Sequence, residues 1–147
     1  MNKSLPDRWV RKAVYDAFNG TSVDGNTINV YDYKITLDAN TDVPDHYIII
    51  STQNNEVDKA NKCEYMWESY CLLDIITTFP KKGNQGSRLL SDNILDALRD
   101  ALKDLTLDVA SGMEIVNVSM SFPADLVANS DGKEIYRKFL RLYLQIN

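Results

Sequence analysis

Histidine and cysteine are scarce in this sequence, and their scarcity excludes most transition-metal sites. The 147 residues include one histidine and two cysteines, so no multi-histidine metal centre can form. His46 follows Val-Pro-Asp at the start of an expected strand, and no nucleophile-elbow sequence accompanies it. The Asp-Ala-Asn-Thr-Asp stretch at 38–42 lacks the glycine and the bidentate glutamate of a calcium loop. We therefore expect no metal, no cofactor and no catalytic role for His46.

The two cysteines do not predict a disulfide. Cys63 and Cys71 are eight positions apart in one expected strand. At about 3.3 Å per residue they would be separated by roughly 26 Å, whereas a disulfide requires Cα atoms within about 7 Å. We expect both thiols to be free and partly buried.

Long apolar runs and an excess of basic residues are also absent. No stretch approaches the roughly 18 apolar residues of a membrane helix, and no apolar run follows the positive charges at the start of the chain, as a signal peptide would require. Asp and Glu number 21 against 16 Lys and Arg, which gives a net charge of -5 and a pI near 4.8. This balance argues against a general nucleic-acid binder. We expect a protein made in the cytoplasm with no membrane partner.

The pattern of apolar residues predicts an ordinary globular domain. With 44% hydrophobic and 25% charged residues, the chain has the composition of a protein with one real core. Helical spacing predicts one helix over 4–18, with Ser4 and Asp7 at capping-box spacing, and a second over about 90–105, with Ser87 as N-cap. Strands are expected at 28–37, 46–51, 63–79, 113–122 and 133–146. We predict a single α+β domain over residues 1–147, in which a mostly antiparallel sheet carries two helices on one face.

Two of the strands show which side chains should face the core. Over 133–146 leucines and isoleucine alternate with Phe139 and polar or aromatic residues, with near-perfect period two. In the strand at 63–79, residues Tyr65 to Ile75 at every second position should share one face. Glu64, Glu68 and Asp74 should lie on the other, more solvated face.

Three segments are expected to project from this domain as loops. Residues 52–62 are polar apart from Val57 and Ala60, which is typical of a hairpin tip with nothing to bury. Residues 123–132 carry Leu126 and Val127 outward on a polar loop, a pattern that often marks a contact surface. The third segment, 79–88, links a strand to a helix.

The basic loop at 79–88 does not match a phosphate-binding loop. A Walker loop needs two glycines with four residues between them, followed directly by Lys and then Ser or Thr. Here Gly83 and Gly86 have two residues between them, and Lys81 and Lys82 precede them. The loop is either a flexible connection or a contact for a protein or a phosphate backbone, and the helix N-terminus beside Arg88 offers a place for an anion.

Carboxylates and tyrosines give no catalytic pattern either. Four aspartates recur at i, i+4 spacing on the second helix, at positions 92, 96, 100 and 104. Such rows are mildly destabilising in isolation, so they indicate either a solvated face or the basic side chains of a neighbouring subunit. The eight tyrosines are spread along the chain without Lys and Arg clusters, so core and interface packing is favoured over base stacking.

The order of these elements resembles a known family. A short helix ending in "AFNG" is followed by "VYDY", "VPDHYIIIS", the aromatic-led strand "WESYCLLDIITTF", a loop, the helix "SRLLSDNILDALRDAL" and a final "YRKFLRLYLQI". Over nearly the whole chain this is similar to the tail-completion and tail-terminator proteins of tailed bacteriophages. It also resembles the related neck ring proteins of the head-to-tail junction, including those of short-tailed, crAss-like phages. The polar insertion at 52–62 and the long 123–132 loop depart from the usual form of the family.

The resemblance implies a structural virion protein rather than an enzyme. Such proteins form rings of six or twelve copies between the portal or adaptor ring and the tail proteins, around a channel that genomic DNA crosses during ejection without sequence-specific binding. An acidic protein suits this role, because a lumen that repels DNA lets the genome slide. The residues that we expect to contact neighbouring subunits or partners are Asn54, Asn55, Glu56, Lys81, Lys82, Gln85, Arg88, Leu126 and Val127.

Other functions remain open at the level of sequence. A monomeric α+β adaptor that binds another protein has no need of self-association. A small phage enzyme, such as a nuclease or hydrolase, would show metal-dependent turnover abolished by replacing one aspartate. A nucleic-acid-binding protein would bind DNA tightly with a steep salt dependence.

Overall fold

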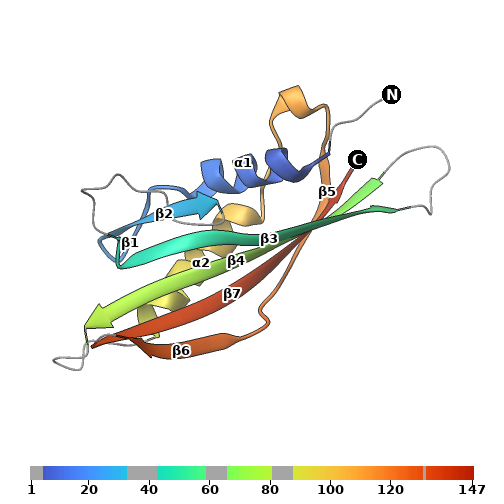
Figure 1. Ribbon diagram of the computed structural model, residues 1–147. Coiled ribbons are helices and arrows are strands. Elements are labelled where there is room, and N and C mark those ends of the chain that lie inside the picture. The colour runs from blue at the N-terminus through green and yellow to red at the C-terminus, as the bar shows by residue number, and fades with distance from the viewer. Residues whose placement is uncertain (1–4, 33–42, 59–65, 81–87, 131) are drawn as a thin grey trace.

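The computed structural model describes residues 5–32, 43–58, 66–80, 88–130 and 132–147 (Figure 1). Its helices are α1 (Asp7–Phe18) and α2 (Leu89–Leu102), with a short 3-10 turn η1 (Val109–Ser111). The strands are β1 (Thr21–Val23), β2 (Asn26–Asp32), β3 (His46–Asp58), β4 (Met66–Pro80), β5 (Ile115–Ser121), β6 (Asp125–Ser130) and β7 (Lys133–Ile146).

All seven strands form one sheet, in which β1, β2, β3, β4, β7 and β5 are successive neighbours and β6 also pairs with β7. Every pairing is antiparallel except that of β2 with β3. Both helices pack on the same face of the sheet and contribute to one apolar core (Figure 1). The fold is therefore α+β with a mostly antiparallel sheet, as the sequence predicted.

The two longest strands, β4 and β7, form the centre of the sheet. Along β7 the buried side chains occupy every second position, from Leu140 to Ile146, which confirms the alternation predicted for this strand. Leu73 on β4 is fully buried and pairs with Leu140 of β7 and Ile50 of β3. Cys71 lies beside them, and burial raises the pKa of its thiol to about 12. Cys63 lies outside the described residues.

Each helix presents one apolar stripe to the sheet. On α1 the buried residues are Val10, Ala13, Val14 and Phe18, and on α2 they include Leu90, Ile94, Leu98 and Leu102. The first helix begins after Pro6, without a side-chain cap, so the expected capping box does not start it, and Ser4 lies outside the described residues. Arg88 holds the N-cap position of α2 without a side-chain bond, and Ser87, the expected cap, also lies outside the described residues.

The stretch after α1 forms a hairpin that the sequence prediction missed. We expected one strand at 28–37, but β1 and β2 pair antiparallel through Val23 and Asn26. Between them Asp24 and Gly25 both adopt positive φ, 51° and 79°, as a two-residue type I′ turn requires. The Asp-Gly dipeptide was the sequence signal for this turn.

Two of the three expected loops are strands instead. Residues 52–58 continue β3 and pair with β4 up to Asp58 and Met66, so only 59–62 of the expected 52–62 loop lie outside the described residues. Residues 125–130 form β6, which is joined to β7 by positions 131–132. Polar composition misled the prediction, because a peripheral strand needs backbone pairing but not two buried faces. Of the third loop, 81–87 lie outside the described residues.

Candidate assembly surfaces

The first group of expected contact residues lies on the far half of β3. Asn54 and Glu56 are exposed there, on the sheet face opposite the helices, which we call the open face. Asn55 points the other way, and its side-chain amide donates to a carboxylate oxygen of Asp7 at 2.5 Å. Gln53 donates to the backbone carbonyl of Asp7 at 3.1 Å. Asn55 therefore fixes the N-terminus of α1 to β3, while Asn54 and Glu56 stay available on the open face.

The second group lies at the other end of the sheet. Leu126 and Val127 are each 49% exposed and are adjacent on β6, so their side chains point to opposite faces. β6 pairs with β7 from Lys133 to Lys138, whereas the far half of β3 is level with the last residues of β7. Arg88 is exposed at the start of α2, and positions 81, 82 and 85 lie outside the described residues. The described contact residues are therefore not one cluster (Figure 1).

The open face is aromatic and carries one buried charge. The rings of Tyr70 and Tyr143 lie 4.9 Å apart. Asp74 is 3% exposed, which corrects the expectation that it lies on a solvated face. The guanidinium of Arg137 covers it, donating from Nε at 3.2 Å and from a terminal nitrogen at 2.5 Å, and it also lies 5.3 Å from the ring centre of Phe139. The hydrogen bond to Asp74 raises the pKa of Arg137.

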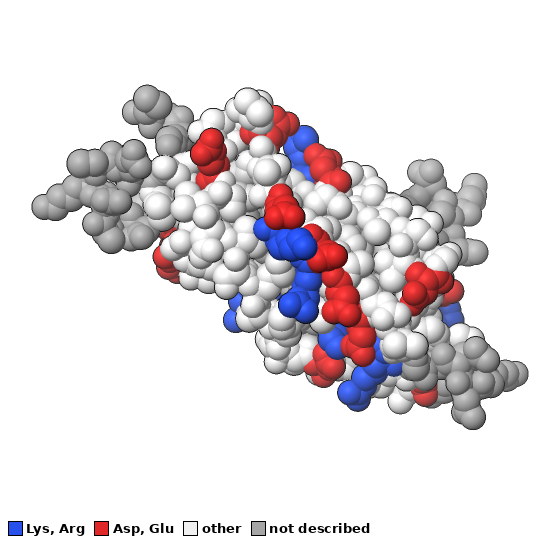
Figure 2. Space-filling model, turned by 180° about the vertical axis from the view of Figure 1, so that it is seen from behind, with Lys and Arg blue, Asp and Glu red and all other residues white. Residues whose placement is uncertain are grey.

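The acidic row on α2 is paired within the chain. Asp92 meets the ammonium of Lys138 on β7, Asp96 lies 3.8 Å from Arg99, and Asp100 lies 3.1 Å from Lys103. Figure 2 shows these charges intermixed in a diagonal band on the helix side of the molecule. The basic side chains of a neighbour are thus not needed to balance these three aspartates.

A groove of about 540 Å³ separates this charged band from the edge strand β5. Its α2 side carries Arg99 and Lys103 together with Asp96 and Asp100, and its β5 side carries Val118, Met120 and Phe122. Arg99 lies 5.5 Å from the ring centre of Phe122, which is 46% exposed. The sequence analysis predicted this strand at 113–122 but did not expect a contact surface on it. Its signal was the complete lack of charged residues from Ile115 to Ala124.

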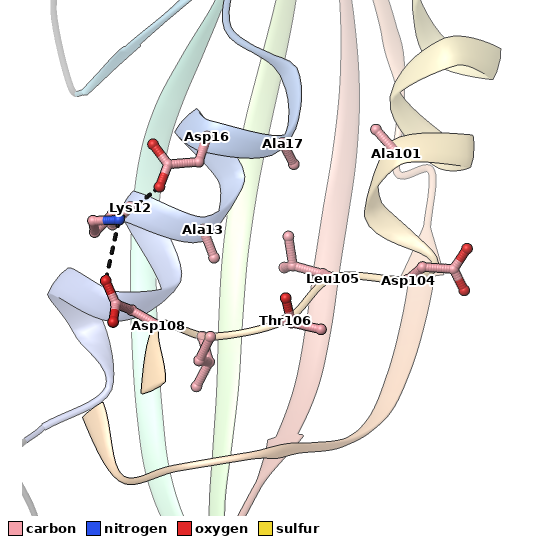
Figure 3. Close-up of a pocket in the computed structure, with 10 residues that line it drawn as sticks. Lys12, Ala13, Asp16, Ala17, Ala101, Asp104, Leu105, Thr106 and Asp108 are labelled. Atoms are coloured by element: carbon pink, nitrogen blue, oxygen red, sulfur yellow. Dashed lines mark hydrogen bonds and ion pairs between the residues drawn. The ribbon is translucent and has the colours of Figure 1, made fainter. Parts of the chain in front are cut away.

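A second cleft, of about 330 Å³, lies between α1 and the segment that follows α2 (Figure 3). Lys12 of α1 bridges two carboxylates there, Asp16 at 2.7 Å and Asp108 at 3.3 Å. Asp108 also accepts a hydrogen bond from the backbone N–H of Ala110 at 2.9 Å, which caps η1. That N–H and the Lys12 ammonium lower the pKa of Asp108.

Replacing Lys12 by methionine is expected to raise the pKa of Asp108 part of the way to its ordinary value, because the Ala110 N–H remains. In the wild type the ionised Asp108 stabilises the fold at any pH above the ordinary pKa of aspartate. This contribution is lost as the pH falls through the lowered pKa of Asp108. Carboxyl-carbon NMR titration measures the shift. Lys103→Met is the matched control, since Lys103 pairs with Asp100. An Asp108 pKa unchanged by Lys12→Met contradicts the bridge.

The histidine and the acidic groups of the described residues do not converge. His46 begins β3, as expected. It is half-buried, its ring lies 5.2 Å from that of Phe79, and desolvation lowers its pKa. Within the described ranges, no group of three or more His, Cys, Asp or Glu is placed to hold a metal ion. Neither of the described helices is long and apolar enough to cross a bilayer.

Comparison with known proteins identifies a structural neighbour but no family. No protein-family model matches the sequence, and no curated protein matches it. Among solved structures, the fold is similar to a chain in the virion of a native gene transfer agent particle, with a TM-score of 0.58. The likeness covers 95% of this chain and 96% of that chain, at 15% sequence identity. At this identity the comparison shows a shared fold.

Proposed function

We propose that this chain is a structural virion protein of a tailed, phage-like particle, where its copies form a ring at the neck or at the end of the tail. The observation that carries the proposal is the likeness to a chain of a gene transfer agent virion, which spans nearly the full length of both chains. The likeness covers the whole domain and not a local motif, so the proposal concerns the whole chain.

The surfaces of the chain support a role in assembly. The open face of the sheet, which carries the Tyr70–Tyr143 ring pair, is covered by no described element, and large apolar side chains are exposed at its margins, among them Val116 and Leu126. Exposed apolar surface on a small domain is typical of a protein–protein contact. The net charge of -5 suits a ring around DNA that must slide rather than bind. In this role the ring joins the portal or adaptor ring to the tail and lets the genome pass during ejection.

The proposal is tested by measuring the chain in purified particles. We expect quantitative mass spectrometry, referenced to the major capsid protein, to give six or twelve copies per particle, and cryo-electron microscopy to place them in the neck or at the tail terminus. Absence from particles overturns the proposal and favours a monomeric adaptor or an enzyme. Copies spread over the head surface contradict the position proposed here.

A further inference from the structure

Two strand edges at the same level of the sheet have no partner among the described residues. β2 pairs with β3 only as far as Ile50, so the outer edge of β3 from Thr52 to Asp58 is open. On the other side of the sheet β5 pairs with β7 alone. The register connects the two edges in rows that cross β4 and β7. One row joins Asn54, Tyr70, Tyr143 and Ser119. This part of the sheet therefore consists of four level strands, with an open edge at each end.

We propose that β5 of one copy pairs with residues 52–58 of β3 of the next copy, so that the sheets of neighbouring subunits join edge to edge. The proposal rests on the ring assembly proposed above and specifies its subunit contact. Both segments are seven residues long. The three pairings from β3 through β4 and β7 to β5 are all antiparallel, so β5 runs opposite to β3. Copies related by rotation alone therefore present antiparallel edges to each other, and the contact repeats head to tail as a ring requires.

The composition of β5 supports this contact, because β5 lacks the charges and the proline that usually protect an edge strand, whereas the β3 edge carries Glu56 and Asp58. Exposed edge strands are normally blunted by charged side chains, by proline or by distortion, because their unpaired N–H and C=O groups otherwise pair with another chain. β5 has a register shift between Ile115 and Asn117, but it has no charged residue and no proline. Its Val116 side chain is 57% exposed. A β-strand supplies the backbone partners that such an edge lacks.

The side chains on the open face of the two edges match in size and polarity. In the level register Ser121 of β5 meets Thr52, Ser119 meets Asn54, and Asn117 meets Glu56. All six are exposed in the single chain. Small hydroxyl and amide pairs are favourable directly opposite each other across antiparallel strands. Glu56 is also directly opposite Glu68 of β4, and a neighbour that brings the uncharged Asn117 beside it adds no further like charge.

In this pairing, the groove beside β5 of one copy receives the start of α1 from the next copy, which lies on the helix side of that copy's β3. Gln53 and Asn55 hold the first turn of α1 against β3, so the neighbour's first turn follows its β3 onto the groove. Leu5, which lies just before this turn and is 59% exposed, is thereby brought to the apolar side formed by Met120 and Phe122. The turn also brings the Asp7 carboxylate towards the basic side chains of α2. The groove is thus occupied by the N-terminal turn of a second copy.

Disulfide cross-linking tests the pairing directly. Asn54→Cys on β3 is combined with Ser119→Cys on β5 in a Cys63→Ser background, in which the remaining Cys71 thiol is buried. On mild oxidation we expect a ladder of linked species up to the size of the ring. Asn117→Cys and Ser121→Cys in place of Ser119→Cys determine the register. Each single-cysteine variant should remain unlinked, and a mixture of the two should stop at dimers.

Several outcomes overturn the pairing and leave the proposed function standing. Rings that form without a cross-link at any of the three β5 positions show that another surface joins the subunits. Dimers from Ser119→Cys alone show that β5 pairs with itself. A wild type that stays monomeric at about 1 mM also rules out the contact. In each case the copy number in purified particles decides the virion role separately.

A surface substitution tests the contribution of the groove. Leu5→Asp is expected to weaken self-association by at least about tenfold in sedimentation equilibrium, because it removes an apolar contact at the centre of an interface. Tyr15→Asp is the control, since Tyr15 is 47% exposed and lies on α1 well beyond the first turn, whereas Leu5 lies just before the helix. Equal self-association of Leu5→Asp and the wild type contradicts the placement of α1 in the groove.

Discussion

Replacing Leu73 by alanine is expected to lower the free energy of unfolding by about 3 kcal/mol, within the range of 2–5 kcal/mol for buried leucines. Leu73 is fully buried at the centre of β4, between Ile50 of β3 and Leu140 of β7. The truncation removes apolar contacts and leaves a cavity, because paired strands on both sides keep the site from collapsing. Urea unfolding followed by circular dichroism measures the loss, and thermal unfolding should show a Tm lower by about 6–12 °C.

The matched control is the same substitution at an exposed position. Leu126 is 49% exposed on β6, so Leu126→Ala should change the free energy of unfolding by less than about 1 kcal/mol. A fall of similar size in both variants means that Leu73 is not in the core. A fall below about 1 kcal/mol for Leu73→Ala contradicts the central place given to β4.

The sequence was informative wherever one face of an element is buried. The alternation along β7 and the helical stripe of α2 indicated the element type and the side chains that face the core, because burial imposes its period on the sequence. Those two elements and the apolar part of β4 were enough to infer the fold class. The N-cap positions of both helices are held by Pro6 and Arg88 without side-chain bonds, and the serines expected as caps, Ser4 and Ser87, lie outside the described residues.

The sequence was least informative at the margins of the sheet, where the proposed assembly contact lies. Residues 52–58 and 125–130 are strands because their backbones pair with β4 and β7. The described side chains of 125–129 are all exposed, and those of 52–57 alternate between exposed and half-buried, but neither segment has the alternation of apolar and polar residues that predicts a strand. The prediction of contacts at Asn54 and Glu56 came from the polarity of the segment together with the family resemblance; both residues are exposed, and the contacts stay a prediction. The opposite edge, β5, required the register of the whole sheet, which relates residues more than sixty positions apart.

Asp74 shows a second limit of prediction from the sequence, because a charged residue in a strand normally indicates a solvated face. The open face around it is largely aromatic and aliphatic, so the carboxylate is buried and depends on Arg137. The pair links β4 to β7 from residues 63 positions apart, and nothing local in the sequence connects them. From the sequence alone, Arg137 could equally be a surface residue or the partner of a buried carboxylate.

Replacing Arg137 by methionine is expected to destabilise the fold by about 3 kcal/mol, because it leaves the Asp74 carboxylate buried without its counter-charge. Methionine keeps much of the aliphatic length that packs beside Phe139 and removes the donors to Asp74. Urea unfolding at neutral pH measures the loss. The double variant Asp74→Leu/Arg137→Met should recover most of it and fall within about 1 kcal/mol of the wild type, since buried ion pairs are often replaced by apolar residues at little cost.

The two variants together separate charge burial from packing. The Arg137 side chain is 42% exposed. If Arg137→Met lowers the free energy of unfolding by less than about 0.5 kcal/mol, solvent screens the ion pair and it is no stronger than a surface salt bridge. If the double variant is as unstable as Arg137→Met, the loss comes from packing against Phe139 and not from the carboxylate. Recovery in the double variant shows that Arg137 neutralises a charge that the fold buries, and that the open face at this point behaves as protein interior.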